Sequence, residues 1–364
     1  MLTDLYFMNL AKELALKSKG KTFPNPLVGA VIVKDKKIIG LGYHQKAGGP
    51  HAEILALRQA KEKAKGARLY VTLEPCSHFG RTPPCVDAIL KSGLKEVIIG
   101  MKDPNPLNNG KSMKILKKNG IKVRAGFLKE ELMKINEPFM KYITKKMPFV
   151  TIKVGQSLDG KIATKTGDAQ WITAEKTRLF THRLRRNYDA ILVGINTVLK
   201  DNPGLNCQGK AIKKIIVDSH LRLPINAKIF HKTDPSIIII AITKFAPVDI
   251  IKRFRIKGVV VLVVGKKNKQ IDLKVLLKEL AKLGISNVLV EGGGEINAAL
   301  LKERLADKIS FFIAPKIIGG NQAINSFGGE GIKFMRQAIE LQDVEVKRIN
   351  HDLWVEGKVV YGNH

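Results

Sequence analysis

Two short stretches decide the fold of the N-terminal half: PHAE at residues 50–53 and EPCSHFGRTPPC at residues 74–85. Together they supply one imidazole and two thiols, from His51, Cys76 and Cys85. One nitrogen and two sulfur ligands suit a tetrahedral zinc ion and leave its fourth position open for water, which is typical of a catalytic site. Glu53 lies two residues from His51, so its carboxylate is the candidate catalytic proton shuttle.

The alternative is that His51 lies on the surface and that both cysteines are core residues. The pairing of H-x-E with P-C about 25 residues later, in the order helix, strand, loop, helix, argues against that alternative. Eight residues separate Cys76 from Cys85, whereas the cysteines of a P-C-x-x-C ligand pair are separated by two. The loop at 77–84 must therefore leave the site and return. His78 and Arg81 lie in this loop and are candidate substrate contacts.

The segments around these motifs alternate between apolar runs of strand type and runs with helical period. Residues 29–34 and 37–42 read as a hairpin around Asp35 and Lys36. Further strands are expected at 68–73, 97–100 and 121–125, and helices at 2–17, 51–65, 85–92, 111–119 and 129–146. This order predicts a layered α/β sheet.

A second alternating series starts after Met147-Pro148, which places the domain boundary near residue 146. We therefore expect one domain at 1–146 and another at 147–364. In the second domain, strands are expected at 149–154, 190–194, 214–218, 236–243, 259–264, 287–291 and 308–314, and helices at 174–186, 272–283 and 295–303.

The composition bounds the class of protein. The chain has 364 residues and three cysteines, too few for a disulfide framework. The N-terminus lacks the apolar core of a signal peptide, and no apolar run approaches the roughly 20 residues that span a bilayer. We expect a soluble, cytoplasmic protein with no membrane partner.

The formal net charge of +31 has two interpretations. It could mark a nucleic-acid partner, or it could be a solvated, lysine-rich surface. Only 14 of the 63 basic residues are arginine, the type preferred for phosphate and base contacts, and the lysines are spread along the chain. We favour the solvated surface and expect no nucleic-acid partner.

Glu291-Gly292-Gly293-Gly294 follows an apolar strand and precedes a helix. Glycines at such a turn let backbone N–H groups approach a phosphate at the helix N-terminus, although the turn could also be purely structural. The stretch does not match the G-x-G-x-x-G fingerprint, so we do not predict a Rossmann fold.

The sequence resembles the bifunctional riboflavin biosynthesis deaminase/reductase family (RibD type). In the first half the resemblance rests on NPLVG at 25–29, GYH at 42–44, HAE at 51–53, EPCSHFGRTPPC at 74–85 and DPNP at 103–106. In the second half it rests on SLDGK at 157–161, QWIT at 170–173, HRLR at 182–185, NTV at 196–198, DNP at 201–203, VDS at 217–219 and APK at 314–316. The long spacing between the cysteines is specific to this branch of the zinc deaminases.

This resemblance implies an N-terminal cytidine-deaminase-like three-layer α/β/α domain and a C-terminal dihydrofolate-reductase-like α/β domain. The first would deaminate 2,5-diamino-6-ribosylamino-4(3H)-pyrimidinone 5′-phosphate with one zinc ion per chain. The second would reduce the ribosyl group to ribityl with NADPH. Family members are often dimers or tetramers, so a homo-oligomer is expected.

The resemblance also implies the residues of each site. The pyrimidine phosphate would contact Asn25, His44, His78, Arg81, Asp103 and Asn105. NADPH would contact Gly155, Trp171, Thr197, Asp201, Gly293, Gly294, Glu295, Ile296, Asn297, Ala298 and Ala299. The reductase substrate would contact Lys153, Ala169, Arg185, Leu205, Gln208 and Glu291.

Several of these assignments have plainer alternatives. Asn25 and Asp103 precede prolines, as ordinary loop residues do, and Trp171 could be a core aromatic. Family members commonly carry Arg where this chain has Gln208, which puts a charged phosphate contact in doubt. Ser219, with Arg222, is a candidate contact for the 2′-phosphate that distinguishes NADPH.

Two other functions compete with the bifunctional enzyme. A nucleic-acid base deaminase with an accessory domain would use the zinc motif and the positive charge, but it leaves the second domain unexplained. A zinc-stabilised binding module without catalysis is suggested only by Gln208 and by Asn108-Asn109-Gly110, where the family usually has small residues.

Overall fold

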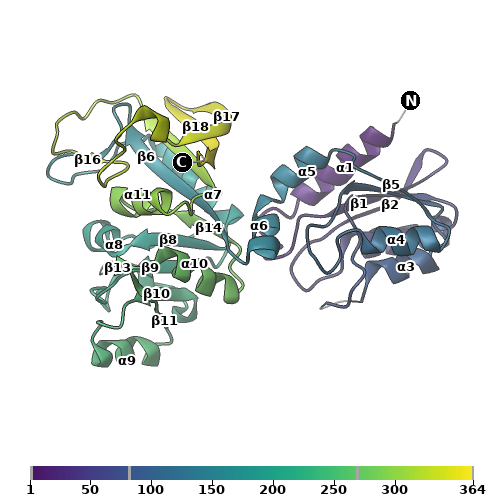
Figure 1. The fold of residues 1–364 in the computed structure, drawn as a ribbon, viewed down its shortest axis with the longest axis horizontal. Coiled ribbons are helices and arrows are strands. Elements are labelled where there is room, and N and C mark those ends of the chain that lie inside the picture. Colours follow the sequence, from purple (N-terminus) through teal and green to yellow (C-terminus); the bar gives the residue numbers. More distant parts are fainter. Residues whose placement is uncertain (1–2, 81–82, 268–269, 363–364) are drawn as a thin grey trace. The chain divides into compact units, whose positions relative to one another are not determined.

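The computed structural model describes residues 3–80, 83–267 and 270–362, and the chain divides into two compact units, residues 1–147 and 148–364. Each unit is built around its own mixed sheet (Figure 1). Among the described residues, no helix is both long enough and apolar enough to cross a membrane.

The first unit contains a five-stranded sheet in the order β2-β1-β3-β4-β5. The first three neighbours pair antiparallel and the last two pairs are parallel. Asp35 and Lys36 both have positive φ, as a tight hairpin turn requires, so the predicted hairpin is confirmed. The strands are β1 (Gly29–Lys34), β2 (Lys37–Tyr43), β3 (Arg68–Leu73), β4 (Glu96–Met101) and β5 (Lys122–Ala125).

Helices cover both faces of this sheet. They are α1 (Asp4–Leu16), α2 (Ala52–Ala60), α3 (Cys85–Lys91), α4 (Lys111–Lys118), α5 (Lys129–Ile135) and α6 (Glu137–Lys145). Two glycines allow the helices to pack closely against the sheet. A Cβ on Gly29 would lie 1.9 Å from the Ala11 carbonyl oxygen of α1, and one on Gly42 would lie 2.1 Å from the Ala52 carbonyl oxygen of α2.

Gly42 pairs with Ala30, the neighbour of Gly29, so the two glycines face opposite sides of the pleated sheet. Helices α1 and α5 lie on one side, and α3 and α4 on the other (Figure 1). The α/β/α layering predicted for this unit is therefore confirmed. Buried Ile, Val, Leu and Ala side chains of β1, β3 and β4 form its core.

Two predicted helices of this unit are shorter than expected. The helix predicted over 51–65 ends at Ala60 and continues as a 3-10 turn, Lys61–Ala64. The helix predicted over 129–146 is broken at Asn136. The buried Asn136 side chain accepts from the Leu27 N–H at 2.8 Å and donates to the Leu27 carbonyl at 3.1 Å, so a long-range contact holds the break.

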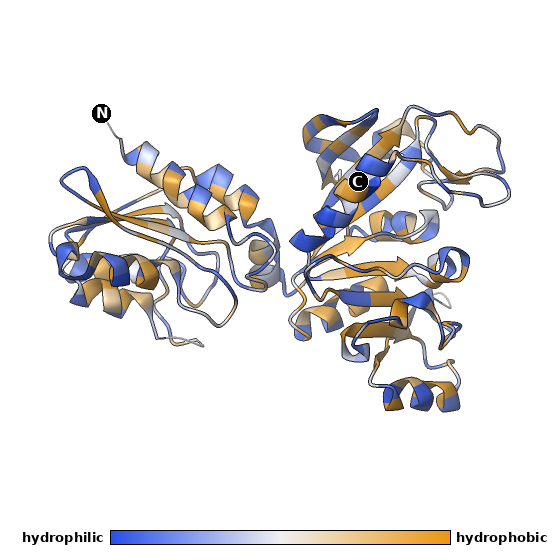
Figure 2. Ribbon diagram, turned by 180° about the vertical axis from the view of Figure 1, so that it is seen from behind, coloured by the Kyte–Doolittle hydropathy of each residue, from blue (hydrophilic) through white to orange (hydrophobic). Residues whose placement is uncertain are grey.

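The second unit contains a nine-stranded sheet in the order β11-β10-β9-β8-β14-β6-β15-β18-β17. The strands from β11 to β15 in this order pair parallel. Strand β18 pairs antiparallel with β15, and β17 pairs antiparallel with β18. Figure 2 shows the central strands as mostly hydrophobic, and β8, β10 and β14 are almost wholly buried. The strands are β6 (Phe149–Ser157), β8 (Ala190–Gly194), β9 (Lys213–Val217), β10 (Ile238–Ile242), β11 (Val260–Val263), β14 (Asn287–Val290), β15 (Lys308–Ala314), β17 (Glu340–Ile349) and β18 (Asp352–Val360).

The helices of this unit are α7 (Glu175–Leu184), α8 (Ile195–Asp201), α9 (Val248–Ile256), α10 (Leu273–Lys282) and α11 (Gly294–Lys302). Two small sheets pair β7 (Lys161–Ala163) with β16 (Ile324–Asn325), and β12 (Lys266–Lys267) with β13 (Gln270–Ile271). The sequence did not predict α8, α9 or the β17–β18 hairpin. Most residues of β17 are exposed, so this strand lacks the apolar pattern of a buried one.

Candidate functional site

Three elements of the first unit bring the predicted metal ligands together. His51 immediately precedes α2, Cys76 follows β3, and Cys85 begins α3. The His51 Nδ1 atom lies 3.1 Å from Cys85 Sγ and 3.6 Å from Cys76 Sγ. These three ligand atoms lie within 4.8 Å of one another, and the nitrogen and two sulfurs fit the donor set of a zinc ion.

The long loop between the cysteines closes as the spacing required. The Cys85 N–H donates to Cys76 Sγ at 3.2 Å, and the Val86 N–H donates to the Cys76 carbonyl at 3.2 Å. Hydrogen bonds from Cys85, and then from His51, lower the pKa of the Cys76 thiol to about 4. These contacts favour the thiolate form of Cys76, which is the form that binds a metal.

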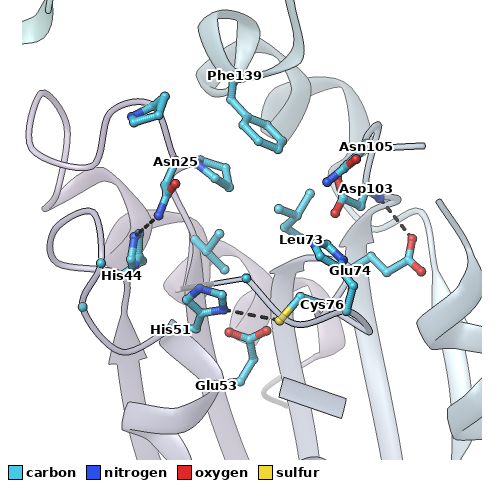
Figure 3. A pocket seen from close by; sticks show the side chains of 17 residues that line it. Asn25, His44, His51, Glu53, Leu73, Glu74, Cys76, Asp103, Asn105 and Phe139 are labelled. Carbon is cyan, nitrogen blue, oxygen red and sulfur yellow. Dashed lines mark hydrogen bonds between the residues drawn. The ribbon is translucent and has the colours of Figure 1, made fainter. Parts of the chain in front are cut away.

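Glu53 lies in the first turn of α2 with only 3% of its surface exposed. Figure 3 places its carboxylate beside His51 and Cys76, at the floor of the site. Burial raises the pKa of this carboxyl group. A carboxylate beside a set of metal ligands, but not one of them, can carry a proton to and from a reacting group.

A cavity of about 280 Å³ opens above this floor. Its walls include residues from both the 23–28 segment and α6, among them Pro24, Asn25, Pro26, Val28, His44, Gly48, Gly49, Leu73, Glu74, His78, Gly80, Asp103, Asn105 and Phe139. Figure 3 shows Phe139 opposite the metal ligands and Asn25 and Asp103 on facing walls.

The hydrogen bonds of His44 fix its tautomer. Its Nδ1 lies 3.1 Å from the Pro50 carbonyl oxygen, which can only accept, so Nδ1 carries the proton. The Nε2 atom then accepts from Asn25 Nδ2 at 3.0 Å. Burial lowers the pKa of His44 and keeps the ring neutral. Asn25 therefore points its carbonyl oxygen toward the cavity (Figure 3).

On the opposite wall, the buried Asp103 carboxylate accepts from the Asn105 N–H at 2.9 Å and from Asn108 Nδ2 at 3.1 Å. His78 lines the cavity, and its buried Nδ1 atom has no hydrogen-bond partner in the described chain. The structure thus gathers Asn25, His44, His78, Asp103 and Asn105 around one cavity. Arg81 lies outside the described residues.

Two polar residues that organise this wall, Glu74 and Asn108, were not among the predicted site residues. The buried Glu74 carboxylate accepts from the N–H groups of Asp103 and Gly110 and from Ser112 Oγ, at 2.8 to 3.1 Å. Asn108 is fully buried as well. Glu74 is the first residue of the EPCSHFGRTPPC stretch and directly follows an apolar strand, and these two features were its sequence signals.

In the second unit, Lys153, Arg185 and Glu291 converge beside the carboxyl end of β14. Arg185 donates two parallel hydrogen bonds to the Glu291 carboxylate, at 2.8 and 2.9 Å, and Lys153 Nζ lies 3.6 Å from it. Burial acts to raise the pKa of Glu291, but the charges of Lys153 and Arg185 outweigh it and lower the pKa to about 2.

The same guanidinium holds the next loop. Arg185 Nη1 donates to the Asn206 carbonyl at 2.8 Å. Asn206 directly follows the buried Leu205 and lies two residues before the exposed Gln208. Gln208 itself accepts from Arg186 Nη2 at 3.3 Å, so a guanidinium lies beside the position where the family commonly has arginine. Of the predicted substrate contacts, Ala169 lies in a separate loop after β7 and has no contact with this cluster among those the structure shows.

The predicted NADPH contacts fall at the ends of several elements. Gly293 precedes α11, and a Cβ there would lie 4.0 Å from Thr197 Oγ1 of α8, so these two positions adjoin. Asp201 ends α8, and Ser219 follows β9, where its carbonyl accepts from Thr243. Gly155 lies within β6.

Trp171 is not a core aromatic. It is 60% exposed, and the Arg178 guanidinium lies 4.2 Å from the centre of its ring. The plainer alternative of a core aromatic is therefore wrong, because a large aromatic side chain can be held by a cation at the surface as well as by burial. An exposed indole face remains compatible with a cofactor contact.

Two domain families match the chain. Residues 148–355 match the RibD C-terminal domain, and residues 1–101 match the cytidine and deoxycytidylate deaminase zinc-binding region. These matches confirm the expected fold class, a cytidine-deaminase-like domain followed by a dihydrofolate-reductase-like domain.

Two relatives match nearly the whole chain. The riboflavin biosynthesis protein RibD of Aquifex aeolicus is 46% identical over 96% of this chain and 97% of its own. The RibD protein of Escherichia coli is 38% identical over 96% and 98%.

Solved structures agree with the sequence matches. An Acinetobacter baumannii RibD structure matches with a TM-score of 0.89 at 37% identity, covering 98% of this chain and 99% of its own. A Thermotoga maritima diaminohydroxyphosphoribosylaminopyrimidine deaminase/5-amino-6-(5-phosphoribosylamino)uracil reductase matches with a TM-score of 0.84, at the same identity and coverage.

Proposed function

The chain belongs to the RibD family, and from that premise we propose how its residues divide between the two reactions of a bifunctional deaminase and reductase of riboflavin biosynthesis. The cofactors are Zn²⁺ and NADPH. We assign the deaminase to residues 1–146 and the reductase to residues 147–364. A nucleic-acid base deaminase is not favoured, because it leaves the reductase family match of residues 148–355 without a function.

One observation carries the assignment of the deaminase site: His51, Cys76 and Cys85 converge beside buried Glu53 at the floor of a single cavity. These three residues would hold the zinc ion, which when bound supplies a Lewis acid that makes water nucleophilic near neutral pH. The nucleophilic water and the substrate would both have to reach this floor through the cavity.

We assign the proton transfers to Glu53. In the deamination, water adds to the ring carbon that carries the amino group, and the C–N bond then breaks to release ammonia. The Glu53 carboxylate would take a proton from the water and deliver it to the departing amine. Its burial keeps it close to the reacting atoms and away from bulk water.

The substrate proposed for this cavity is the ribosylaminopyrimidine phosphate named for the Thermotoga relative. Asn25, ordered by His44, and Asp103 would bind polar edges of the pyrimidine from facing walls. His78 and Asn105 would complete the polar contacts, and Arg81 remains our candidate for the phosphate.

In the second reaction NADPH supplies a hydride, which reduces the former anomeric carbon of the ribosyl group. We propose that Lys153 and Arg185, held by the carboxylate of Glu291, orient the sugar phosphate. Leu205, Gln208 and Ala169 remain candidate contacts of the same substrate. The proposed cofactor contacts are Thr197 in the first turn of α8, residues 293–299 at the start of α11, and Gly155, Trp171, Asp201 and Ser219.

The deaminase assignment is tested with Glu53→Gln, which keeps the shape of the side chain and removes its charge. We expect ammonia release to fall at least 10²-fold, since general acid–base catalysis contributes about 10²–10⁴-fold. Zinc content and NADPH oxidation with pre-deaminated substrate should be unchanged. The matched control is Glu62→Gln, an exposed glutamate in the turn after α2, which should behave as the parent enzyme. Normal ammonia release by Glu53→Gln would refute the role of Glu53.

We also propose that the enzyme is a cytoplasmic homo-oligomer, a dimer or a tetramer. Edge strand β17 supports the oligomer, because it exposes Val344 and Val346 together with backbone groups on its open side. The three free cysteines support a reducing compartment. Light scattering of the purified protein should give two or four chains, and a monomer at micromolar concentration would refute the assembly.

A further inference from the structure

Asn108 makes an unusual set of contacts for a loop residue. Its side chain is fully buried, and all of its polar atoms are engaged. The amide oxygen accepts from the Ser77 N–H at 3.0 Å and from Ser77 Oγ at 2.6 Å. The amide nitrogen donates to the Pro75 carbonyl at 2.9 Å and to Asp103 Oδ2 at 3.1 Å.

These contacts bracket one metal ligand. Pro75 and Ser77 are the neighbours of Cys76 on either side, so a single carboxamide fixes the backbone before and after the ligand. The remaining hydrogen of that carboxamide goes to Asp103, on the wall of the cavity. The backbone of Asn108 is itself fixed, because its N–H donates to the Asn105 carbonyl at 2.9 Å.

The chemistry of the side chain suits this task. A primary amide has two donor hydrogens and an oxygen that accepts twice, so it can satisfy four partners at once. No apolar side chain of similar size could do so, and each buried partner left without a hydrogen bond costs roughly 1–3 kcal/mol. The residues that hold metal ligands in place commonly change metal affinity 10- to 100-fold when they are replaced.

We propose that Asn108 is a positioning residue that couples the Cys76 segment of the metal site to Asp103 of the substrate wall. The proposal rests on the proposed deaminase function, in which Cys76 binds zinc and Asp103 binds the pyrimidine. Asn108 stands where the family usually has a small residue, and under this proposal it is not a sign of lost catalysis. In this chain the larger residue adds a support between the two parts of the site.

The experiment compares two substitutions of Asn108 with a neighbour. Asn108→Leu removes all four hydrogen bonds at similar volume. Asn108→Asp keeps the two acceptor contacts with Ser77, on one side of Cys76. It cannot donate to the Pro75 carbonyl or to Asp103, and it places a second carboxylate beside Asp103. Asn109→Leu is the matched control, since Asn109 is exposed in the same loop.

Zinc affinity is measured by competition with a chromogenic chelator, and KM and kcat from ammonia release with the zinc-loaded full chain. For Asn108→Leu we expect zinc affinity to fall about tenfold and KM to rise about tenfold. For Asn108→Asp we expect a similar rise in KM but a loss of zinc affinity of no more than about threefold. Asn109→Leu should change neither quantity.

Unchanged zinc affinity or unchanged KM in a folded Asn108→Leu protein would overturn the coupling. If circular dichroism shows that this variant does not fold, Asn108→Asp decides, and an unchanged KM there overturns the proposal. The Glu53→Gln experiment stands apart from this result. Loss of ammonia release in Glu53→Gln with unchanged behaviour of both Asn108 variants would reject only the role of Asn108.

Discussion

Replacing Glu291 with glutamine removes the charge that pairs with Arg185 and Lys153 in the second unit. The three side chains are only 9%, 10% and 19% exposed, so the two cations would be left largely out of water without a counter-charge. Breaking a buried pair in this way typically costs about 3–5 kcal/mol. The lowering of the Glu291 pKa from 4.5 to about 2 gives an independent figure of about 3 kcal/mol.

The pH dependence of this loss has a definite sign. The pKa of Glu291 is lower in the folded state than in the unfolded chain, so its contribution is complete above about pH 4.5 and is lost as the pH falls toward 2. We therefore expect Glu291→Gln to be less stable than the parent by about 3 kcal/mol at pH 7. The gap should narrow steadily below pH 4.5.

The chain offers its own reporter for this measurement. It has two tryptophans, Trp171 and Trp354, and both lie in the second unit. Urea unfolding followed by tryptophan fluorescence therefore reports that unit without interference from the first.

The matched control is Glu279→Gln, which removes the exposed pair with Lys282 on α10 and should cost less than about 1 kcal/mol. If Glu291→Gln were as stable as this control at pH 7, or if its gap to the parent did not change with pH, the electrostatic reasoning would be wrong.

Three further predictions concern packing, pH and the metal. Gly29→Ala should destabilise the first unit by more than about 3 kcal/mol, because the new Cβ would lie 1.9 Å from the Ala11 carbonyl oxygen. In the control Gly66→Ala the new Cβ meets no atom, so the substitution should cost only about 1 kcal/mol. The urea transition followed by circular dichroism, and not by tryptophan fluorescence, measures both losses, and equal losses would contradict the prediction. Burial lowers the pKa of Lys214 to about 8, and its ammonium nitrogen lies 2.6 to 3.1 Å from four oxygens, two of them on Gly204 and Asn206. The reductase KM should therefore rise above pH 8 as the proton is lost, and Lys214→Met should show a raised KM without that step; an identical pH profile in both would count against the idea. Removing zinc with a chelator should abolish ammonia release but leave NADPH oxidation with pre-deaminated substrate intact, and a parallel loss of both activities would contradict the division of the chain.

The parts of the fold that the sequence predicted are those set by local pattern. The hairpin around Asp35 follows from two apolar runs with a tight turn between them, and the metal ligands follow from side-chain chemistry at a fixed spacing. The helix break at Asn136 has a local signal that our prediction overlooked, because Pro138 lies in the first turn of α6 and disfavours a helix interior. The hydrogen bonds from Asn136 to Leu27, more than a hundred residues away, could not be predicted from the local sequence.

The same distinction holds within the site. Glu53 could be proposed as the proton carrier because it lies two residues from a candidate ligand in the sequence. Asn108 could not be found in this way, because it contacts Pro75 and Ser77 from a distant loop. The exposed position of Trp171, beside the guanidinium of Arg178, could not be predicted, because the sequence does not show which arginine lies against the ring. Most of the net charge of +31 still has no assigned role.

The hydrogen-bond chain from Pro50 through His44 to Asn25 has a direction, and the direction selects among ligands. A backbone carbonyl at its start cannot donate, so each group along the chain is forced to donate toward that carbonyl. The oxygen of Asn25 that faces the cavity is left as an acceptor. The wall should therefore prefer a heterocycle that presents an N–H or amino group over an isosteric one that presents only ring nitrogens or an alkoxy oxygen, and it makes this choice without using any charge.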